Sequence, residues 1–358
     1  MEDFFNLEGY LNEGLRSLVK DALRQTLRSP QGTAFFGQYG ARAKKAERLR
    51  RRALKAGDHI PPFLIASVTR QCNLGCAGCY DRARQDPGGI SEMSPRDWSR
   101  IFGEAEELGV AAILLAGGEP LTRPDVLEEA AQYSSMLFPI FTNGTMLDKK
   151  YAEFFEKYRH LIPIISVEGD EVLTDKRRGC GVYAQAMRAM EYLKAFDLLF
   201  GGSVTVTSRN IQEITQEETV ADLKEKGCKV LVFVEYVPVT NPELALDLGG
   251  RRALEERVRT LRNQQDLIII SFPGDEAASG GCLGAGRGFF HINAVGGAEP
   301  CPFSPYSDAS LKTASLRDVL RSPLFMRLQQ DGVLGKTHTG GCVLFEEALH
   351  VQSLVSSR

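Results

Sequence analysis

Three closely spaced cysteines, Cys72, Cys76 and Cys79, constrain the fold of this chain more than any other feature of its sequence. They follow an apolar run, residues 61–69, that predicts one buried β-strand. We therefore expect them in a loop just past the carboxyl end of a strand, where α/β folds place their chemistry. Three thiols within eight positions are too dense to result from packing alone.

Thiolates grouped in this way select zinc, copper or an iron–sulfur cluster. A structural zinc site normally has four ligands, and no further Cys or His lies nearby in the sequence. An iron–sulfur cluster held by three cysteines, with one iron open to a substrate, fits the count better. Zinc is the alternative.

The bulk composition is that of an ordinary globular protein. The chain has 358 residues, 43% hydrophobic and 25% charged, and its net charge of −3 argues against general nucleic-acid binding. Eight cysteines in this length would not make a disulfide scaffold, and the clustered ones indicate metal ligands in a reducing cytosol. No apolar run reaches the ~18 residues of a membrane span, and no secretory signal opens the chain. We expect a cytoplasmic protein.

Short apolar runs alternate with amphipathic segments through the middle of the chain, which predicts parallel strands joined by right-handed crossovers. The interpretation is an α/β fold, a partial (β/α)6 TIM-like barrel, with an open doubly wound sheet as the alternative. The expected strands are 62–69, 111–116, 136–142, 162–167, 202–207, 230–237 and 267–271. The expected helices are 94–108, 123–134, 149–158, 183–195 and 215–226.

Three regions are predicted: an N-terminal helical segment (1–57), the partial barrel (58–274) and a small C-terminal domain (275–358). The first ends in a strongly basic stretch, residues 41–55. We expect an amphipathic helix pair packed on the barrel with a solvated basic face. A helix lying on an anionic membrane is the alternative.

The C-terminal region carries a second cysteine set, Cys282, Cys301 and Cys342, in glycine-rich surroundings. Alternating residues between the first two predict a β-hairpin, with Cys282 before it and Cys301 at its end. Residues 315–330 are expected to be helical.

The motif C-x3-C-x2-C at the end of the first strand, followed by Gly117-Gly118-Glu119-Pro120 at the end of the second, resembles the radical SAM superfamily. The resemblance implies that the three cysteines hold a 4Fe–4S cluster whose open iron binds S-adenosylmethionine. It also implies reductive cleavage of that cofactor to a 5′-deoxyadenosyl radical, which abstracts hydrogen from a substrate.

The chemistry of residues 117–120 agrees with this resemblance. Gly117 and Gly118 allow close approach of backbone to a ligand, and Glu119 with its neighbours offers acceptors for a cationic amine. A plain glycine turn is the alternative. One departure is Gly78, where the family usually carries an aromatic residue; Tyr80 follows the third cysteine instead. Further candidates for cofactor contact follow later strands: Pro120, Thr142, Asn143, Ser166, Glu168 and Ser208.

The segment from Cys282 to Cys301, with Cys342, is similar to the SPASM or twitch extension of radical SAM enzymes. This implies one auxiliary 4Fe–4S cluster held by three cysteines, with a fourth ligand from another side chain, solvent or substrate. Three unconnected buried cysteines are the alternative. His291 is expected to be structural, and His338 is a weaker candidate ligand.

Two cysteines stand apart from both sets. Cys228 precedes a strand and is expected to be an ordinary buried residue. Cys180 lies in a polar loop beside Lys176, Arg177 and Arg178. A thiol there could donate hydrogen to a substrate radical, and the cations would increase its reactivity or bind an acidic substrate group.

The predicted function is a radical SAM oxidoreductase or maturase acting on a peptide or protein, with a low-potential donor such as flavodoxin or ferredoxin. One alternative is a radical SAM dehydrogenase, dehydratase or epimerase of a small molecule. The other is a non-catalytic electron-transfer protein with two clusters.

Overall fold

Seven parallel strands form the centre of the protein, and each lies where the sequence predicts one. The structure is a computed structural model that describes residues 6–83, 91–274, 278–338 and 341–356. The strands are β1 (Phe63–Ser67), β2 (Ala112–Ala116), β3 (Phe138–Thr142), β4 (Leu161–Val167), β5 (Gly201–Val206), β6 (Val230–Glu235) and β7 (Ile268–Phe272). They consist mostly of buried aliphatic residues, because a parallel sheet is covered on both faces.

The predicted crossover helices are present as α4 (Pro95–Leu108), α5 (Pro124–Ala130), α6 (Lys149–Lys157), α8 (Val182–Ala195) and α10 (Glu217–Glu225). Helix α4 begins at a capping box, in which the side chains of Ser94 and Asp97 each accept the other's backbone N–H. The remaining elements of this part are α3 (Tyr80–Ala83), α7 (Glu171–Arg178), α9 (Ile211–Ile214) and the 3-10 helices η1 (Pro120–Thr122) and η2 (Pro242–Leu244).

Helix α11 (Leu248–Gln264) is absent from the sequence prediction. Its buried residues, Leu254, Val258 and Leu261, do follow helical spacing. Many charged residues surround them and two glycines open the segment, which obscures the pattern in the sequence.

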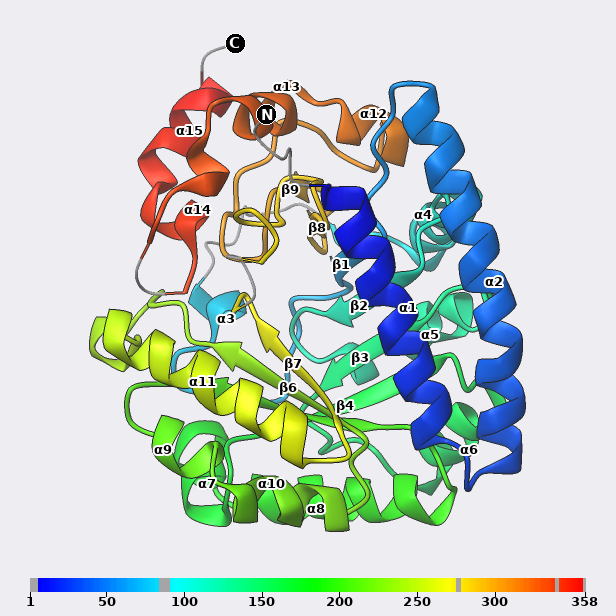
Figure 1. Cartoon of the computed structure of the whole chain (residues 1–358), viewed down its shortest axis with the longest axis vertical. Coiled ribbons are helices and arrows are strands. Elements are labelled where there is room, and N and C mark those ends of the chain that lie inside the picture. Colours follow the sequence, from blue (N-terminus) through cyan, green and yellow to red (C-terminus); the bar gives the residue numbers. More distant parts are fainter. Residues whose placement is uncertain (1–5, 84–90, 275–277, 339–340, 357–358) are drawn as a thin grey trace.

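The sheet has the order β7-β6-β5-β4-β3-β2-β1-β8-β9, so strands consecutive in the chain are neighbours in space (Figure 1). A doubly wound sheet would instead reverse direction at a switch point. The predicted hairpin is β8 (His291–Ile292) with β9 (Ala298–Glu299), and β8 also pairs in parallel with β1. Because β7 and β9 form the two edges within the described residues, the sheet is open. The partial barrel is confirmed, and the C-terminal hairpin extends its sheet.

Helices α1 (Leu7–Gln25) and α2 (Pro30–Lys55) lie side by side against the barrel (Figure 1). Phe36 and Tyr39 of α2 share an apolar cluster with Ile164 and Val232, while the crossover helices pack with the other faces of those strands. The Tyr39 hydroxyl donates to the carbonyl of Ala111 at 2.9 Å. The helix pair is therefore packed on the sheet, as expected.

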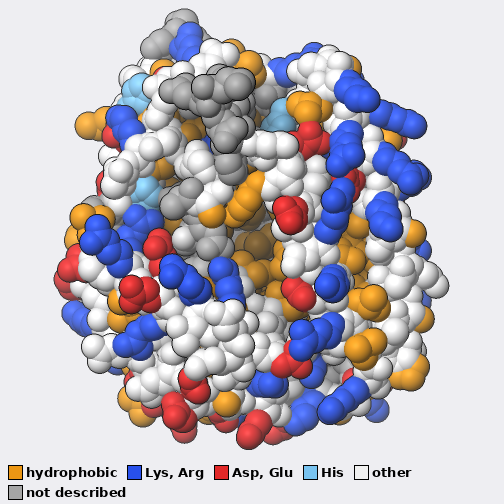
Figure 2. Space-filling view, viewed as in Figure 1, with side chains coloured by type: hydrophobic (Ala, Val, Ile, Leu, Met, Phe, Trp, Pro, Cys, Tyr) orange, Lys and Arg blue, Asp and Glu red, His pale blue; other side chains and the backbone are white. Residues whose placement is uncertain are grey.

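The basic stretch of α2 faces solvent and forms a run of cations along one side of the molecule (Figure 2). The exposed cations are Lys44, Lys45, Arg48, Arg51, Arg52 and Lys55. No helix in the described part of the chain is long and apolar enough to cross a membrane.

The C-terminal region packs around the β8–β9 hairpin (Figure 1). The helical stretch predicted over 315–330 is present as two helices, α12 (Leu316–Leu320) and α13 (Pro323–Gln330). Pro323 cannot continue a helix, and Ser322 caps the next one by accepting the backbone N–H of Phe325. The last elements are η3 (Val333–Gly335), α14 (Val343–Glu346) and α15 (Ala348–Ser356).

Candidate functional site

The loop of Cys72, Cys76 and Cys79 follows β1 at the carboxyl end of the sheet. Cys72 is exposed and the other two thiols are half-buried. The pKa of the Cys72 thiol is raised, mainly because neighbouring protein atoms limit the contact of its sulfur with water. The nearby thiols of Cys76 and Cys79 raise this pKa further by electrostatic repulsion. The backbone N–H of Ala77 donates to the carbonyl of Arg177 at 2.8 Å, which ties the loop to the end of α7. The structure therefore brings the three predicted thiols together at the mouth of the barrel.

Gly117 and Gly118 run against the segment that leads into this loop. A Cβ on Gly117 would lie 2.3 Å from the carbonyl oxygen of Thr69, and one on Gly118 would lie 2.0 Å from that of Gln71. Gly118 and Glu119 donate backbone hydrogen bonds to those same carbonyls, at 2.7 and 2.8 Å. The two glycines are therefore required by contact between strand ends, a reason that the sequence does not reveal.

Glu119 is a buried carboxylate that organises the end of β3. It accepts hydrogen bonds from the hydroxyl of Thr142 at 2.6 Å and the backbone N–H groups of Asn143 at 2.8 Å and Leu121 at 3.0 Å. Burial raises the pKa of Glu119, while these hydrogen bonds and Arg178 oppose the rise. Three predicted residues, Glu119, Thr142 and Asn143, thus form one hydrogen-bonded group, and Pro120 opens η1 beside it.

This group is joined to the cysteine loop by Asn73, which the sequence analysis does not select. The amide of Asn143 donates to the side-chain oxygen of Asn73 at 2.9 Å, and Asn73 donates to the hydroxyl of Thr145 at 2.8 Å. Its position directly after Cys72 is the only sequence signal that marks Asn73.

Glu168, at the end of β4, is surrounded by cations. Its carboxylate contacts Arg177 at 2.5 Å and Arg178 at 2.6 Å, and it also accepts the backbone N–H of Thr205 at 3.3 Å. The hydroxyl of Ser166 lies 3.1 Å from that of Ser203. Two of the three cations expected near Cys180 are therefore committed to a carboxylate of the protein.

Cys180 and Ser208 lie at the surface. Cys180 is exposed in the turn between α7 and α8. Ser208 is exposed, and its hydroxyl donates to the carbonyl of Glu243 at 2.8 Å rather than to the Glu119 group. Both assignments stay predictions.

The second cysteine set converges although its members lie far apart in the chain. Cys282, Cys301 and Cys342 are all buried, and Cys301 forms a side-chain hydrogen bond with Cys342. The pKa of the Cys301 thiol is raised well above its ordinary value, first by burial and then by the neighbouring thiols. The backbone N–H of Gly284 donates to the Cys282 sulfur at 3.3 Å.

The two cysteine sets are linked by contacts across the barrel mouth and through the sheet. The ring of Tyr80 meets the ring of Phe303 edge-on, with 5.3 Å between their centres. His291 is fully buried, with its ring nitrogens 2.8 Å from the Ser67 hydroxyl and 2.7 Å from the Glu299 carboxylate. These contacts agree with the structural role expected for His291. The backbone carbonyl of His338 accepts a hydrogen bond from the guanidinium of Arg251 at 2.7 Å.

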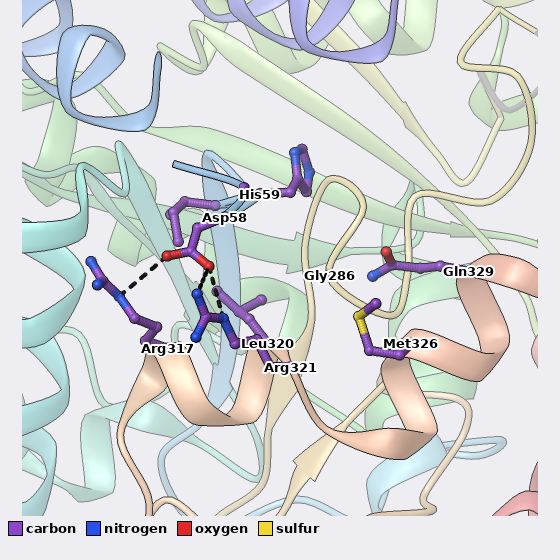
Figure 3. A pocket seen from close by; sticks show the side chains of 10 residues that line it. Asp58, His59, Gly286, Arg317, Leu320, Arg321, Met326 and Gln329 are labelled. Carbon is purple, nitrogen blue, oxygen red and sulfur yellow. Dashed lines mark hydrogen bonds and ion pairs between the residues drawn. The ribbon is translucent and has the colours of Figure 1, made fainter. Parts of the chain in front are cut away.

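A separate cavity of about 190 Å³ lies between the end of α2 and helices α12 and α13 (Figure 3). Arg321 and Arg317 flank the Asp58 carboxylate there, and the nearer nitrogen–oxygen pair of Arg317 is 3.8 Å apart. None of the predicted site residues lines this cavity.

In the described parts of the chain, no three His, Cys, Asp or Glu side chains converge closely enough to hold one single ion. The fit to a cluster therefore rests on the donor chemistry. Three soft thiols on one loop, partly open to solvent at the strand ends, suit an iron–sulfur cluster with one accessible iron.

The open parallel sheet with polar groups at its strand ends is a partial-barrel α/β fold. Residues 66–216 match the radical SAM superfamily. Mycofactocin maturase MftC of Mycobacterium ulcerans is 30% identical, covering 69% of this chain and 70% of that relative. The AdoMet-dependent heme synthase of Methanosarcina barkeri is 28% identical, covering 78% of this chain and 88% of that relative.

Among solved structures, SuiB of Streptococcus suis bound to the precursor peptide SuiA has the same fold. It is 18% identical with a TM-score of 0.64, covering 84% of this chain and 72% of that one. This chain belongs to the radical SAM superfamily. It is therefore an S-adenosylmethionine-dependent enzyme, and the family implies a 4Fe–4S cluster with S-adenosylmethionine as cofactors. The alternative of a non-catalytic electron-transfer protein is set aside.

Proposed function

We propose that this enzyme is a maturase in which Cys72, Cys76 and Cys79 hold the cluster that binds S-adenosylmethionine, and that its substrate is a peptide or protein. When bound and reduced, such a cluster supplies the electron that cleaves S-adenosylmethionine to a 5′-deoxyadenosyl radical. The observation that carries the proposal is the direct hydrogen bonding between the Gly117–Glu119 segment and the chain entering the cysteine loop.

The residues of this chain would bind and orient the cofactor in distinct ways. Gly117 and Gly118 leave room at the mouth of the barrel because no side chain projects from them. Glu119 would act on the cofactor indirectly, because its carboxylate oxygens hold Thr142 and Asn143 in place. The hydrogen bond from Asn143 to Asn73 would keep the cysteine loop at one distance from the end of β3.

Three more positions are weaker candidates for cofactor contact. Ser166 and Glu168 lie at the end of β4, and Tyr80 follows Cys79. Glu168 is held by Arg177 and Arg178, so it would orient these arginines toward the site rather than accept from the cofactor itself. Ser208 has the weakest support, because its hydroxyl is used by Glu243.

A second cluster at Cys282, Cys301 and Cys342 belongs to the same proposal. The support for it is that three buried thiols interact with one another although up to 60 positions separate them along the chain. One auxiliary 4Fe–4S cluster would be held by three cysteines, with its fourth ligand open. Such a cluster would relay an electron from the substrate or bind the substrate itself. Residues 275–358 would then form the auxiliary-cluster domain beside the barrel, 58–274, and the helical segment, 1–57.

The peptide substrate is supported by the mycofactocin maturase among the relatives and by the fold shared with SuiB. A small-molecule substrate is the second candidate, because the heme synthase relative matches this chain over 88% of its own length. A hydrogen-donating role of Cys180 would serve an epimerase of either substrate class.

The proposal places the enzyme in the reducing cytoplasm, where iron–thiolate ligands persist, with a flavodoxin or ferredoxin as electron donor. Peripheral membrane contact through α2 would depend mainly on its exposed cations. The apolar residues Phe36 and Tyr39 are already buried against the sheet.

The test is anaerobic incubation of the iron-loaded enzyme with reductant and S-adenosylmethionine, followed by assay of 5′-deoxyadenosine. We expect the native chain to release it and a Cys72→Ala variant to release none. The matched control is Cys228→Ala, because Cys228 is buried against Met190, with 3.9 Å between the sulfurs, and belongs to neither set. Cleavage that survives in Cys72→Ala would contradict the proposal.

A further inference from the structure

Ser304 closes a tight turn that begins at Cys301, the middle member of the second cysteine set. The backbone N–H of Ser304 donates to the carbonyl of Cys301 at 3.0 Å, and the two residues form an isolated antiparallel bridge. Residues opposite each other in such a pair present their side chains on the same face, with Cβ atoms about 4.5–5.5 Å apart. The Ser304 hydroxyl and the Cys301 thiol are therefore carried on one side of this turn.

The Ser304 hydroxyl is buried without a hydrogen-bond partner among the described residues. The residue is 0% exposed, and its side-chain oxygen bonds to no described atom. The other buried serines in the described chain all have hydrogen-bonded hydroxyls: Ser29, Ser67, Ser203, Ser279 and Ser322. A buried hydroxyl that has given up its bonds to water and gained none in return is unfavourable. Ser304 therefore stands apart as a side chain in need of a partner.

The spacing of this turn is that of a pair of cluster ligands. Ser304 is the third residue after Cys301, as Cys79 is the third after Cys76, so residues 301–304 form C-x2-S where the first set has C-x2-C. Cysteines at this spacing recur as ligands of iron–sulfur clusters. Cys301 in turn forms a hydrogen bond with Cys342 and interacts electrostatically with Cys282. The turn thus adds a fourth donor atom to the three thiols.

We propose that Ser304 is the fourth ligand of the second cluster, binding the iron that the three cysteines leave open. The inference rests on the proposed function, which does not assign this position. On binding, the hydroxyl releases its proton to solvent and the oxygen bonds to the iron as an alkoxide, with no change in the number of electrons. A cluster whose four irons are all held by side chains has no iron free for substrate. The inference therefore favours electron relay over substrate binding at this cluster.

The test uses the full chain carrying Cys72→Ala, so that only the second set holds a cluster. The protein is loaded with iron and sulfide, reduced and mixed with ¹³C-labelled cyanide, and electron–nuclear double resonance measures coupling of the ¹³C nucleus to the cluster spin. We expect no coupling while Ser304 is present, because its oxygen occupies the fourth iron, and clear coupling in Ser304→Ala. The matched control is Ser307→Ala, which should show none, because the Ser307 hydroxyl already donates to the carbonyl of Ala309 at 2.7 Å.

A second variant, Ser304→Cys, tests the ligand by its chemistry. It should hold the whole cluster and exclude cyanide, because a thiolate takes the place of the alkoxide. The softer thiolate stabilises the reduced cluster more than the alkoxide does. A redox titration followed by electron paramagnetic resonance should show the reduction equilibrium shifted at least about tenfold toward the reduced form, which is about 59 mV for one electron. An unchanged potential would contradict the inference even where Ser304→Ala fails to hold a cluster.

Two further outcomes overturn the inference separately from the proposed function. Cyanide coupling in the protein that retains Ser304 would show that the fourth iron is already open. Absence of coupling in a Ser304→Ala protein that keeps its iron would show that another group holds it. If the Cys72→Ala protein holds no iron at the second set, the proposed auxiliary cluster fails and the inference fails with it. Iron analysis and thermal unfolding of every variant separate this last result from the other two.

Discussion

The two cysteine sets differ in how the chain brings their thiols together. Cys72, Cys76 and Cys79 lie on one loop and are exposed or half-buried. Cys282, Cys301 and Cys342 come from three segments and are buried, with exposed fractions of 6%, 3% and 4%. The first set depends on the conformation of a single loop, whereas the second depends on the packing of a hairpin, a glycine-rich turn and the start of α14.

This difference follows the chemistry proposed for each set. A cluster that binds a cofactor needs an open side, which a loop at the barrel mouth provides. A cluster that only relays an electron, or anchors a substrate, is better shielded from water, which a buried set provides. The comparison leads to four predictions: three concern which set a substitution affects, and the fourth concerns the barrel away from both sets.

The largest expected effect is complete loss of one cluster. Cys72→Ala should remove the iron of the first set and all cleavage of S-adenosylmethionine, because two thiolates cannot hold an open-sited cluster. Cys301→Ala should remove the iron of the second set and leave cleavage in place. Iron analysis with electron paramagnetic resonance of the reduced protein measures both. Loss of both clusters in either variant would break the distinction between the sets.

His291→Ala should disturb both sets together. His291 joins Ser67 of β1, five positions before Cys72, to Glu299 of β9, two positions before Cys301. Removing a partner from a buried hydrogen-bonded carboxylate costs about 3–5 kcal/mol. We expect a lower denaturation midpoint in urea and reduced iron at both sets. His350→Ala, at a half-buried histidine of α15 that contacts Asp331 rather than a residue of either set, is the control.

Alanine at two glycines should affect the sets one at a time. Gly118→Ala places a Cβ 2.0 Å from the carbonyl oxygen of Gln71, beside the first set. Gly281→Ala places one 2.4 Å from that of Leu334, beside Cys282. Each should cost about 3 kcal/mol or more, because neither carbonyl can move freely. Gly37→Ala, in α2 with no atom within 4 Å of the new Cβ, should instead be stabilising or neutral in thermal unfolding.

The smallest effect concerns the barrel away from both sets. Burial lowers the pKa of His160 from 6.5 to about 4, with the Ala130 carbonyl acting in the opposite direction. Between these two pKa values, His160 binds a proton in the unfolded chain but not in the folded chain. The free energy of unfolding therefore falls as pH decreases from 6.5 toward 4. The loss is at most about 3 kcal/mol. His160→Gln should flatten this part of the pH profile in urea unfolding, and an unchanged slope would exclude His160 as its source.

The fold was predictable where each element carries its own signal. The seven parallel strands were found because each is a contiguous apolar run between turn residues, as in residues 111–116. Helix α4 was found from Ser94 and Pro95, which mark a helix start. Helix α11 was missed because arginines and glutamates surround its three buried residues.

The sequence by itself determined that three thiols share one loop and that a Gly-Gly-Glu-Pro turn follows the next strand, because those groups are neighbours in the chain. Only the tertiary structure decided that β8 pairs with β1, that Cys301 meets Cys342, and that Tyr236 covers Gly78. Each of these contacts joins residues at least 41 positions apart. Such contacts form only when the whole chain buries its apolar surface, and no local pattern encodes them.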